Sequence, residues 1–180
     1  MPSLSVEEIQ QYSKYKADIF IETGTYLGDT TNNALKYFDN VYTIELSPYY
    51  AQMARDRFKN NLNLSIIEGD SSKVLYNLCN IITKSVFFWL DGHWSGGNTA
   101  RGSIDCPLLE EIKIINNNLK SKCIIAIDDV RLFNTNINEN WSGITRDNIL
   151  EIVKSRLESC TYYPSQYNPE DRMVLHLNEI

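Results

Sequence analysis

Short apolar segments alternate along the chain with stretches in which apolar residues recur every three or four positions. The short segments are rich in β-branched and aromatic residues, as in Ile19-Phe20-Ile21, and they predict strands. The periodic stretches between them predict helices. The predicted strands are Asp18–Glu22, Asn40–Glu45, Leu62–Glu68, Ser85–Asp91, Cys123–Asp128, Cys160–Ser165 and Arg172–Leu177. The predicted helices are Val6–Tyr15, a segment from Gly28 to Phe38, Pro48–Asn60, Ser72–Ile82, Asp105–Leu119 and Thr145–Glu158.

Strand and helix alternate five times before a final pair of strands closes the chain. Such alternation predicts an α/β fold in which a doubly wound, mostly parallel sheet carries helices on both faces. The segment from Ser85 to Asp91 is almost entirely apolar, which is typical of a central strand buried on both sides. The closing pair predicts one antiparallel strand near an edge. With 180 residues, the whole chain 1–180 is expected to form one domain.

The charge balance and the cysteines narrow the class of protein. The formal net charge is −6, which argues against a nucleic-acid partner because such a protein needs a basic face. The four cysteines have neither disulfide-framework nor metal-finger spacing, so we expect reduced thiols. No apolar run is long enough to cross a membrane, and the first residues do not resemble a signal peptide. We therefore expect a cytoplasmic protein without a membrane partner.

The turn after the first predicted strand has the composition of a ligand-binding loop. Glu22 ends the strand, and Gly24 and Gly28 frame the turn that leads into a helix. Glycine lets the backbone approach a ligand, and a helix N-terminus offers unpaired N–H groups. The spacing G-x-x-x-G differs from the G-x-G-x-x-G that grips a dinucleotide pyrophosphate. With the acid two positions earlier, it favours a ligand that carries an amino acid, although an ordinary structural turn of an α/β domain is the alternative.

Each of the first five predicted strands ends in an acidic residue. Because ligands of doubly wound folds bind at the carboxyl ends of the strands, these acids should converge on one edge of the sheet. Glu45 stands where an acid accepts hydrogen bonds from ribose hydroxyls, and Asp70 with Ser71 could hold an adenine amine. Glu22 and Asp91 could pair with an ammonium group. The alternative is that some of the acids cap the helices that follow. The acids are Glu22, Glu45, Glu68 or Asp70, Asp91 and Asp128.

Taken together, these segments resemble the Rossmann-like (class I) S-adenosylmethionine-dependent methyltransferases. The matching stretches are IETGTYLGDT, YTIELSP, IIEGDS and FFWLDGHW, in that order. The resemblance implies the sheet order 3-2-1-4-5-7-6 with strand 7 antiparallel. It implies S-adenosylmethionine (SAM) as cofactor, with its methionine part near Glu22, Gly24 and Gly28, its ribose at Glu45 and its adenine at Asp70 and Ser71. The full set of expected cofactor contacts is Glu22, Thr23, Gly24, Thr25, Tyr26, Gly28, Thr30, Glu45, Leu46, Gly69, Asp70, Ser71 and Asp91.

A second acidic group combines Asp91 with Asp128 and Asp129. Adjacent strands would bring these carboxylates together, where a cation would relieve their repulsion, and oxygen ligands suit Mg²⁺ or Ca²⁺. The arrangement resembles metal-dependent O-methyltransferases of the catechol and macrolide-sugar types, although the segment 95–102 is longer here. The alternative is that Asp128 or Asp129 pairs with Arg101 or Arg131 instead.

The polar segments 92–104 and 131–144 are expected to lie on the acceptor side. His93 could act as general base toward a hydroxyl group, or it could be an ordinary surface or hydrogen-bonded histidine. Trp94, Arg101 and Asp105 are the expected acceptor contacts, and Asp91, His93 and Asp128 the expected catalytic residues. The N-terminal segment 1–16 could form a flap over the site or only a surface cover.

The sequence therefore predicts a methyltransferase that methylates an oxygen of a small-molecule or sugar acceptor, with or without a divalent cation. A metal-dependent hydroxylase or hydrolase on the same scaffold, and a cofactor-binding protein without catalysis, remain alternatives. The chain lacks the glycine pattern of a nicotinamide-dependent dehydrogenase, which argues against that class. The identity of the acceptor is open, and so is the oligomeric state, with a homodimer as one option.

Overall fold

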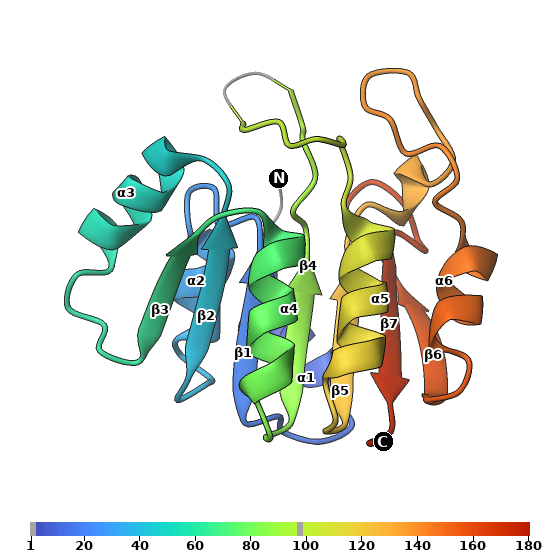
Figure 1. The fold of residues 1–180 in the computed structure, drawn as a ribbon, viewed down its shortest axis with the longest axis horizontal. Coiled ribbons are helices and arrows are strands. Elements are labelled where there is room, and N and C mark those ends of the chain that lie inside the picture. The colour runs from blue at the N-terminus through green and yellow to red at the C-terminus, as the bar shows by residue number, and fades with distance from the viewer. Residues whose placement is uncertain (1–2, 97–98) are drawn as a thin grey trace.

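The computed structural model describes residues 3–96 and 99–180. Residues 1–2 of the predicted N-terminal segment and residues 97–98 of the predicted acceptor-side loop lie outside the described residues. A seven-stranded sheet forms the central layer, with helices on both of its faces (Figure 1). The strands are β1 Ile19–Thr23, β2 Val41–Glu45, β3 Leu64–Glu68, β4 Val86–Leu90, β5 Cys123–Ile127, β6 Leu157–Tyr163 and β7 Arg172–Leu177.

The strand order is β3-β2-β1-β4-β5-β7-β6. Strands β1 to β5 are parallel to one another, and β7 runs antiparallel to both β5 and β6. The predicted fold class, order and antiparallel strand are therefore confirmed. The helices are α1 Val6–Tyr12, α2 Asp29–Ala34, α3 Pro48–Arg57, α4 Ser71–Ile81, α5 Leu108–Asn118 and α6 Arg146–Val153, with a 3₁₀ turn η1 at Val130–Leu132.

The sheet separates two hydrophobic cores, and β4 contributes to both. Its alternate residues Phe87 and Trp89 pack in the core beneath α1 and α2. Phe88 and Leu90 point to the other side, into the core beneath α4, α5 and α6. Successive strand side chains point to opposite faces, so a central strand with both faces covered must be apolar throughout.

The helix starts follow the capping residues in the sequence. Ser5 caps α1 and Glu8 returns the bond to the Ser5 N–H, which completes the predicted capping box. Ser47 caps α3, and Pro48 follows at the first helical position. The first helix ends at Tyr12, short of its predicted end.

The predicted end of the sixth helix is wrong. Helix α6 stops at Val153, and Leu157 already belongs to β6. The reason is Arg156, which is 3% exposed and whose guanidinium donates to the carbonyl oxygens of Asn116 and Ser121 at distances of 2.9 and 2.8 Å. It thereby satisfies carbonyls near the end of α5 that would otherwise lack donors. This tertiary contact overrides the local helical pattern.

The N-terminal helix α1 is tied to the far end of the chain. Arg172, on β7, is 1% exposed and contacts Glu8, the Tyr12 hydroxyl at 3.1 Å and Asp128 at 3.2 Å. These contacts hold helix α1 on the sheet, while Ser3, which precedes it, lines the cavity beneath the β1 turn. All four cysteines are free thiols. No helix within 3–96 and 99–180 is both long and apolar enough to cross a membrane.

Candidate functional site

Two cavities lie at the carboxyl ends of the parallel strands, and the β1 turn separates them. The larger, of about 210 Å³, reaches from the ends of β2 and β3 to the segment after β4. The smaller, of about 100 Å³, lies beneath the β1 turn. Gly24, Tyr26 and Asp91 border both cavities, so a ligand that extends across the turn would contact all three residues.

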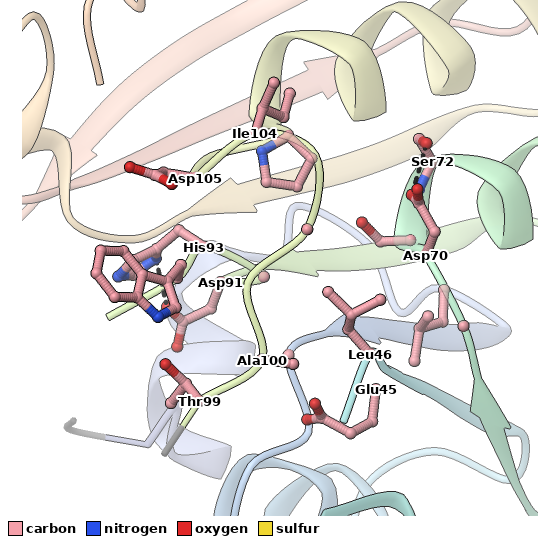
Figure 2. A pocket seen from close by; sticks show the side chains of 18 of the residues that line it. Glu45, Leu46, Asp70, Ser72, Asp91, His93, Thr99, Ala100, Ile104 and Asp105 are labelled. Carbon is pink, nitrogen blue, oxygen red and sulfur yellow. Dashed lines mark hydrogen bonds and ion pairs between the residues drawn. The ribbon is translucent and has the colours of Figure 1, made fainter. Parts of the chain in front are cut away.

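Figure 2 shows how the predicted residues surround the larger cavity, with Asp70 on one side and Asp91 and His93 on the other. Of the predicted residues, it is lined by Gly24, Tyr26, Glu45, Leu46, Gly69, Asp70, Ser71, Asp91, His93, Trp94 and Asp105. The smaller cavity is lined by Glu22, Gly24, Thr25, Tyr26, Gly28, Thr30 and Asp91. The structure thus brings together residues from four separate strand ends.

The β1 turn needs glycine because its backbone touches β4. Gly24 has φ +84°, and a Cβ there would lie 2.5 Å from the carbonyl oxygen of Asp91. Tyr26 also has a positive φ of 48°, a conformation that is costly for a residue with a side chain. Its N–H donates to Glu45 Oε2 at 2.9 Å, which holds the turn against the end of β2. The turn is therefore prearranged around Glu45.

Glu22 is buried beneath this turn and already has hydrogen-bond donors. Its Oε2 accepts from the hydroxyls of Thr31, at 2.5 Å, and Thr43, at 2.8 Å. Burial raises the pKa of Glu22 to about 8, against the lowering effect of the two threonines. Without a ligand the carboxyl group is therefore mostly protonated at pH 7. A cationic ligand in the smaller cavity would favour the ionised form.

The predicted ribose and adenine residues have carboxylate oxygens that can still accept bonds. Glu45 Oε1 accepts from the Ser47 N–H at 2.8 Å, and each carboxylate oxygen has a second lone pair. Asp70 uses Oδ1 to accept from both the N–H and the hydroxyl of Ser72. Asp70 therefore caps α4, which was the alternative interpretation of this acid. Its Oδ2 stays available to a ligand.

His93 lies among three carboxylates after β4. Its side chain is 4% exposed, and its Nδ1 lies 3.5 Å from Asp91 Oδ1. Its Nε2 lies 3.4 Å from Asp129 Oδ2 and 3.5 Å from Glu139 Oε2. Burial lowers the pKa of His93, although Asp129 and Glu139 oppose the shift. Burial, and then the charges of Asp128 and Asp129, raise the pKa of Asp91 well above its usual range.

The predicted metal group Asp91, Asp128 and Asp129 is only partly assembled. Asp128 Oδ1 accepts from Arg172 at 3.2 Å instead, and burial still raises the pKa of Asp128 to about 6. Asp129 Oδ1 pairs with Arg131 at 2.5 Å, as the alternative reading allowed, while its Oδ2 faces His93. Donor atoms of Asp91, His93 and Asp129 lie within 4.8 Å of one another. Asp91 therefore groups with His93 and Asp129, whereas Asp128 lies in a second such group with Asp129 and Asp171, in which Arg172 pairs with Asp128 and Arg131 with Asp171.

Of the predicted acceptor-side residues, some line the cavity and others hold the two loops together. Trp94 lines the cavity, and the Arg101 guanidinium lies 4.5 Å from the centre of its ring. Asp105 pairs with Arg101 at 2.6 Å and accepts from the Asn140 N–H at 3.0 Å, so it joins the segments 92–104 and 131–144. Arg101 and Asp105 thus hold the loops together, and Arg101 does not line the cavity.

Thr23, Thr25 and Thr30 have partly structural surroundings. Thr30 Oγ1 accepts from the Leu4 N–H at 3.1 Å, and the Thr25 hydroxyl lies 2.6 Å from that of Thr43. Thr23 is fully buried and lines neither of the two cavities, so the structure does not place it as a cofactor contact.

Two acidic residues near the site were missed in the sequence. Glu139 lies in a polar loop whose sequence pattern does not indicate a site residue. Glu111 lies on α5 between Leu108 and Ile115, on the apolar face of that helix, and is 1% exposed. An acid at such a core position is a signal that periodicity could have found.

Comparisons with known proteins agree with this fold. No protein-family model matches the chain. A stretch of 93 residues, 47% of this chain, is 32% identical to the "Probable ribosomal RNA small subunit methyltransferase A" of Methanococcoides burtonii, and covers only 34% of that protein. The O-methyltransferase TomG from Streptomyces achromogenes, in complex with SAM, has a TM-score of 0.65 at 15% identity, over 92% of this chain and 74% of TomG.

SAM-bound CalS10, an amino pentose methyltransferase from Micromonospora echinaspora, has a TM-score of 0.62 at 11% identity, over 96% of this chain and 88% of CalS10. At these identities the likeness establishes a shared fold. The expected resemblance to the Rossmann-like SAM-dependent methyltransferases is therefore confirmed at the level of the fold.

Proposed function

We propose that this protein transfers a methyl group from SAM to an oxygen of a small acceptor, such as a sugar or another small hydroxylated molecule. The observation that carries the proposal is the larger cavity, which joins Glu45 and Asp70 to Asp91 and His93 in one space. A nucleoside at one end and a base at the other is the arrangement that methyl transfer from SAM requires. The neighbours TomG and CalS10, which hold SAM on the same fold, support the choice of cofactor.

The cofactor would lie across the β1 turn. Glu45 would accept hydrogen bonds from the ribose hydroxyls and Asp70 Oδ2 from the adenine amine. Glu22 and Asp91, which border the smaller cavity, would face the ammonium group of the methionine part. These carboxylates also suit the positive charge of the sulfonium.

The acceptor would bind between Trp94 and His93. The lowered pKa of His93 leaves its imidazole neutral at pH 7, as a general base requires. Asp91 near Nδ1, and Asp129 and Glu139 near Nε2, would orient the ring beside the acceptor, and the unprotonated ring nitrogen would receive the proton of the acceptor hydroxyl. Because the methyl group of SAM is already activated, alignment and proton removal are the main tasks of the protein.

A divalent cation is the second candidate for the same task. The residues present fit such an ion, since Asp91 Oδ1 is buried without a hydrogen-bond partner among the described residues, close to His93 and Asp129. Asp91, His93 and Asp129 would then hold the ion, and a nitrogen ligand favours a transition metal over Mg²⁺. When bound, the ion would supply Lewis-acid activation of the acceptor oxygen. His93 would be a ligand and not the base in that case.

The charge of the cavity favours a neutral or cationic acceptor. Five acidic residues line it, and none of its described lining residues is a lysine or arginine, although Asp105 pairs with Arg101 outside the cavity and burial raises the pKa of Asp91. These acidic residues would repel a phosphate-rich acceptor such as RNA, so a small neutral or cationic acceptor suits the cavity better than RNA does. The carboxylates are those of Glu45, Asp70, Asp91, Asp105 and Glu110.

Calorimetry with S-adenosylhomocysteine (SAH) tests the cofactor assignment. Glu45→Ala removes charged acceptors, each worth about 1.5–3 kcal/mol, so we expect at least about tenfold weaker binding. Glu68→Ala is the matched control, because Glu68 ends the neighbouring strand but pairs with Arg55 at 3.1 Å and lines neither cavity. Equal affinities for the two variants would exclude this cofactor site.

Methyl transfer from labelled SAM to a panel of hydroxylated acceptors tests the reaction. Activity that survives chelation but is lost in His93→Gln would identify His93 as the base. Loss of activity on chelation, with recovery when a transition metal is added, would favour the metal-assisted form. SAH binding without transfer to any acceptor would point to a binding protein instead.

A further inference from the structure

Trp141 is a buried side chain that the proposed reaction does not use. It lies in the segment 131–144, is 2% exposed and belongs to the hydrophobic core beneath α4, α5 and α6. The Trp141 N–H donates to the Thr135 carbonyl at 2.9 Å, and the Trp141 carbonyl accepts from the Ile144 N–H at 3.1 Å. The Phe133 ring stacks near the indole, with 6.1 Å between the ring centres. The indole is therefore anchored by its backbone and by a second aromatic ring.

The indole ring of Trp141 contacts the imidazole of His93. The two ring centres are 4.8 Å apart, and the ring planes are tilted by 59°. Both residues also line a small cavity of about 10 Å³ next to the larger one. Aromatic rings at such distances attract one another in particular orientations. An anchored indole therefore restricts the rotation of the His93 ring.

The indole N–H of Trp141 holds a carboxylate that faces the same histidine. Trp141 Nε1 donates to Glu139 Oε2 at 2.9 Å, and that oxygen lies 3.5 Å from His93 Nε2. A buried indole N–H usually finds an acceptor, and a bond to a charged acceptor is among the stronger hydrogen bonds. The Glu139 side chain is 16% exposed, so without this bond it could turn toward water. One side chain thus contacts His93 with its ring and controls the carboxylate beside Nε2 with its N–H.

We infer that Trp141 is a positioning residue, which orients the imidazole of His93 directly and through Glu139. The inference rests on the proposed function for its consequence, because the ring must face the acceptor whether it acts as base or holds an ion. The neighbouring Asn140 N–H donates to Asp105 at 3.0 Å, which ties this segment to the loop after β4 at the same edge of the sheet (Figure 1). The segment 131–144 is thereby part of the reaction centre.

Nuclear magnetic resonance at one fixed pH tests the arrangement without any acceptor. The chain has two histidines and three tryptophans, so His93→Gln and Trp141→Phe assign the relevant imidazole and indole signals. Trp141→Leu removes the aromatic ring, and we expect the imidazole C–H signals of His93 to move because the ring current of the indole is lost. We expect Glu139→Ala to move the Trp141 Nε1–H signal, which loses its acceptor. The signals of His176 should stay in place in both variants.

Methyl transfer from labelled SAM, to an acceptor of the panel that the wild type methylates, tests the consequence. Trp141→Phe keeps a ring beside His93 but has no N–H, so we expect kcat to fall about tenfold, as loss of one hydrogen bond to a charged group implies. The affinity for SAH should stay within about threefold of the wild type. In the Glu139→Ala background, Trp141→Phe should lower kcat by no more than about threefold further, because the bond is already absent.

The matched control is Ile149→Val, which trims a fully buried residue of the same core on α6. It should lower the Tm without changing kcat or the His93 signals. A kcat of Trp141→Phe no lower than that of Ile149→Val would make Trp141 only a core residue.

Unmoved His93 signals in Trp141→Leu, or losses of Trp141→Phe and Glu139→Ala that add in the double variant, would overturn the inference. If Trp141→Leu does not fold, an unmoved Trp141 Nε1–H signal in Glu139→Ala would overturn it. A wild-type protein that transfers no methyl group, but shows the expected signal changes in the variants, would refute the proposed function and confirm that Trp141 orients His93.

Discussion

Gly24→Ala is the substitution whose effect the structure defines most closely. A side chain at φ +84° costs roughly 1–2 kcal/mol in the left-handed region. The new Cβ would also lie 2.5 Å from the Asp91 carbonyl oxygen, and overpacking of this kind costs roughly 1–3 kcal/mol. The sum is roughly 2–5 kcal/mol, or a decrease in Tm of roughly 4–20 °C for a chain of this size.

Gly143→Ala separates the two contributions. Gly143 has φ +78°, but nothing lies within 4 Å of its Cβ position, so this variant should show only the conformational cost. Urea unfolding of both variants gives the free energies, and SAH titration of the folded fraction shows whether the β1 turn still binds ligand. If Gly24→Ala loses no more stability than Gly143→Ala, the close contact between the β1 turn and β4 does not exist as described.

Three further predictions concern charged groups. Arg172→Met leaves Asp128 buried without its cation and should cost about 3–5 kcal/mol in urea unfolding, whereas Arg172→Met with Asp128→Asn should recover part of the loss; no recovery would contradict the pairing. The pKa of Glu22 is raised from 4.5 to about 8, so the folded state holds a proton that the unfolded state releases, and stability should fall between pH 4.5 and 8. Glu22→Gln should flatten that part of the curve, and an unchanged slope would refute the assignment. If His93 is the base, the rate of methyl transfer should fall as the pH drops through the lowered pKa of His93. Glu139→Gln removes a charge that raises this pKa, so the fall in rate should move to lower pH. A shift to higher pH would contradict the geometry.

The sequence predicted the fold well because the central strands carry their own signal. A strand such as β4, which is apolar at every position, must lie in a sheet whose two faces are both covered by helices. Because it stands in a series of alternating strands and helices, that sheet is expected to be parallel. The acids at the strand ends were predicted to converge on one edge of the sheet, and Glu45, Asp70 and Asp91 do line one cavity there.

What the sequence could not predict depends on contacts between distant residues. Nothing local shows that Arg156 satisfies the end of α5 and so ends α6 early. Likewise, Asp128 and Asp129 look equivalent in sequence. In the structure Arg172 pairs with Asp128, whereas Oδ2 of Asp129 faces His93. The choice between two adjacent acids is made by an arginine 44 positions away from Asp128.

The position of β7 also dictates when the site can form. This strand follows β6 in the chain but lies between β5 and β6 in the sheet, and its Arg172 contacts Glu8, 164 positions earlier. A growing chain therefore presents the open edge of β5, with Asp128 at its end and no cation, until β7 has been synthesised. Open strand edges invite association with other chains, and long-range pairing is slow. We expect the group of Asp91, His93 and Asp129 to be among the last parts of the molecule to assemble, and partly synthesised chains to be the form that most needs chaperones.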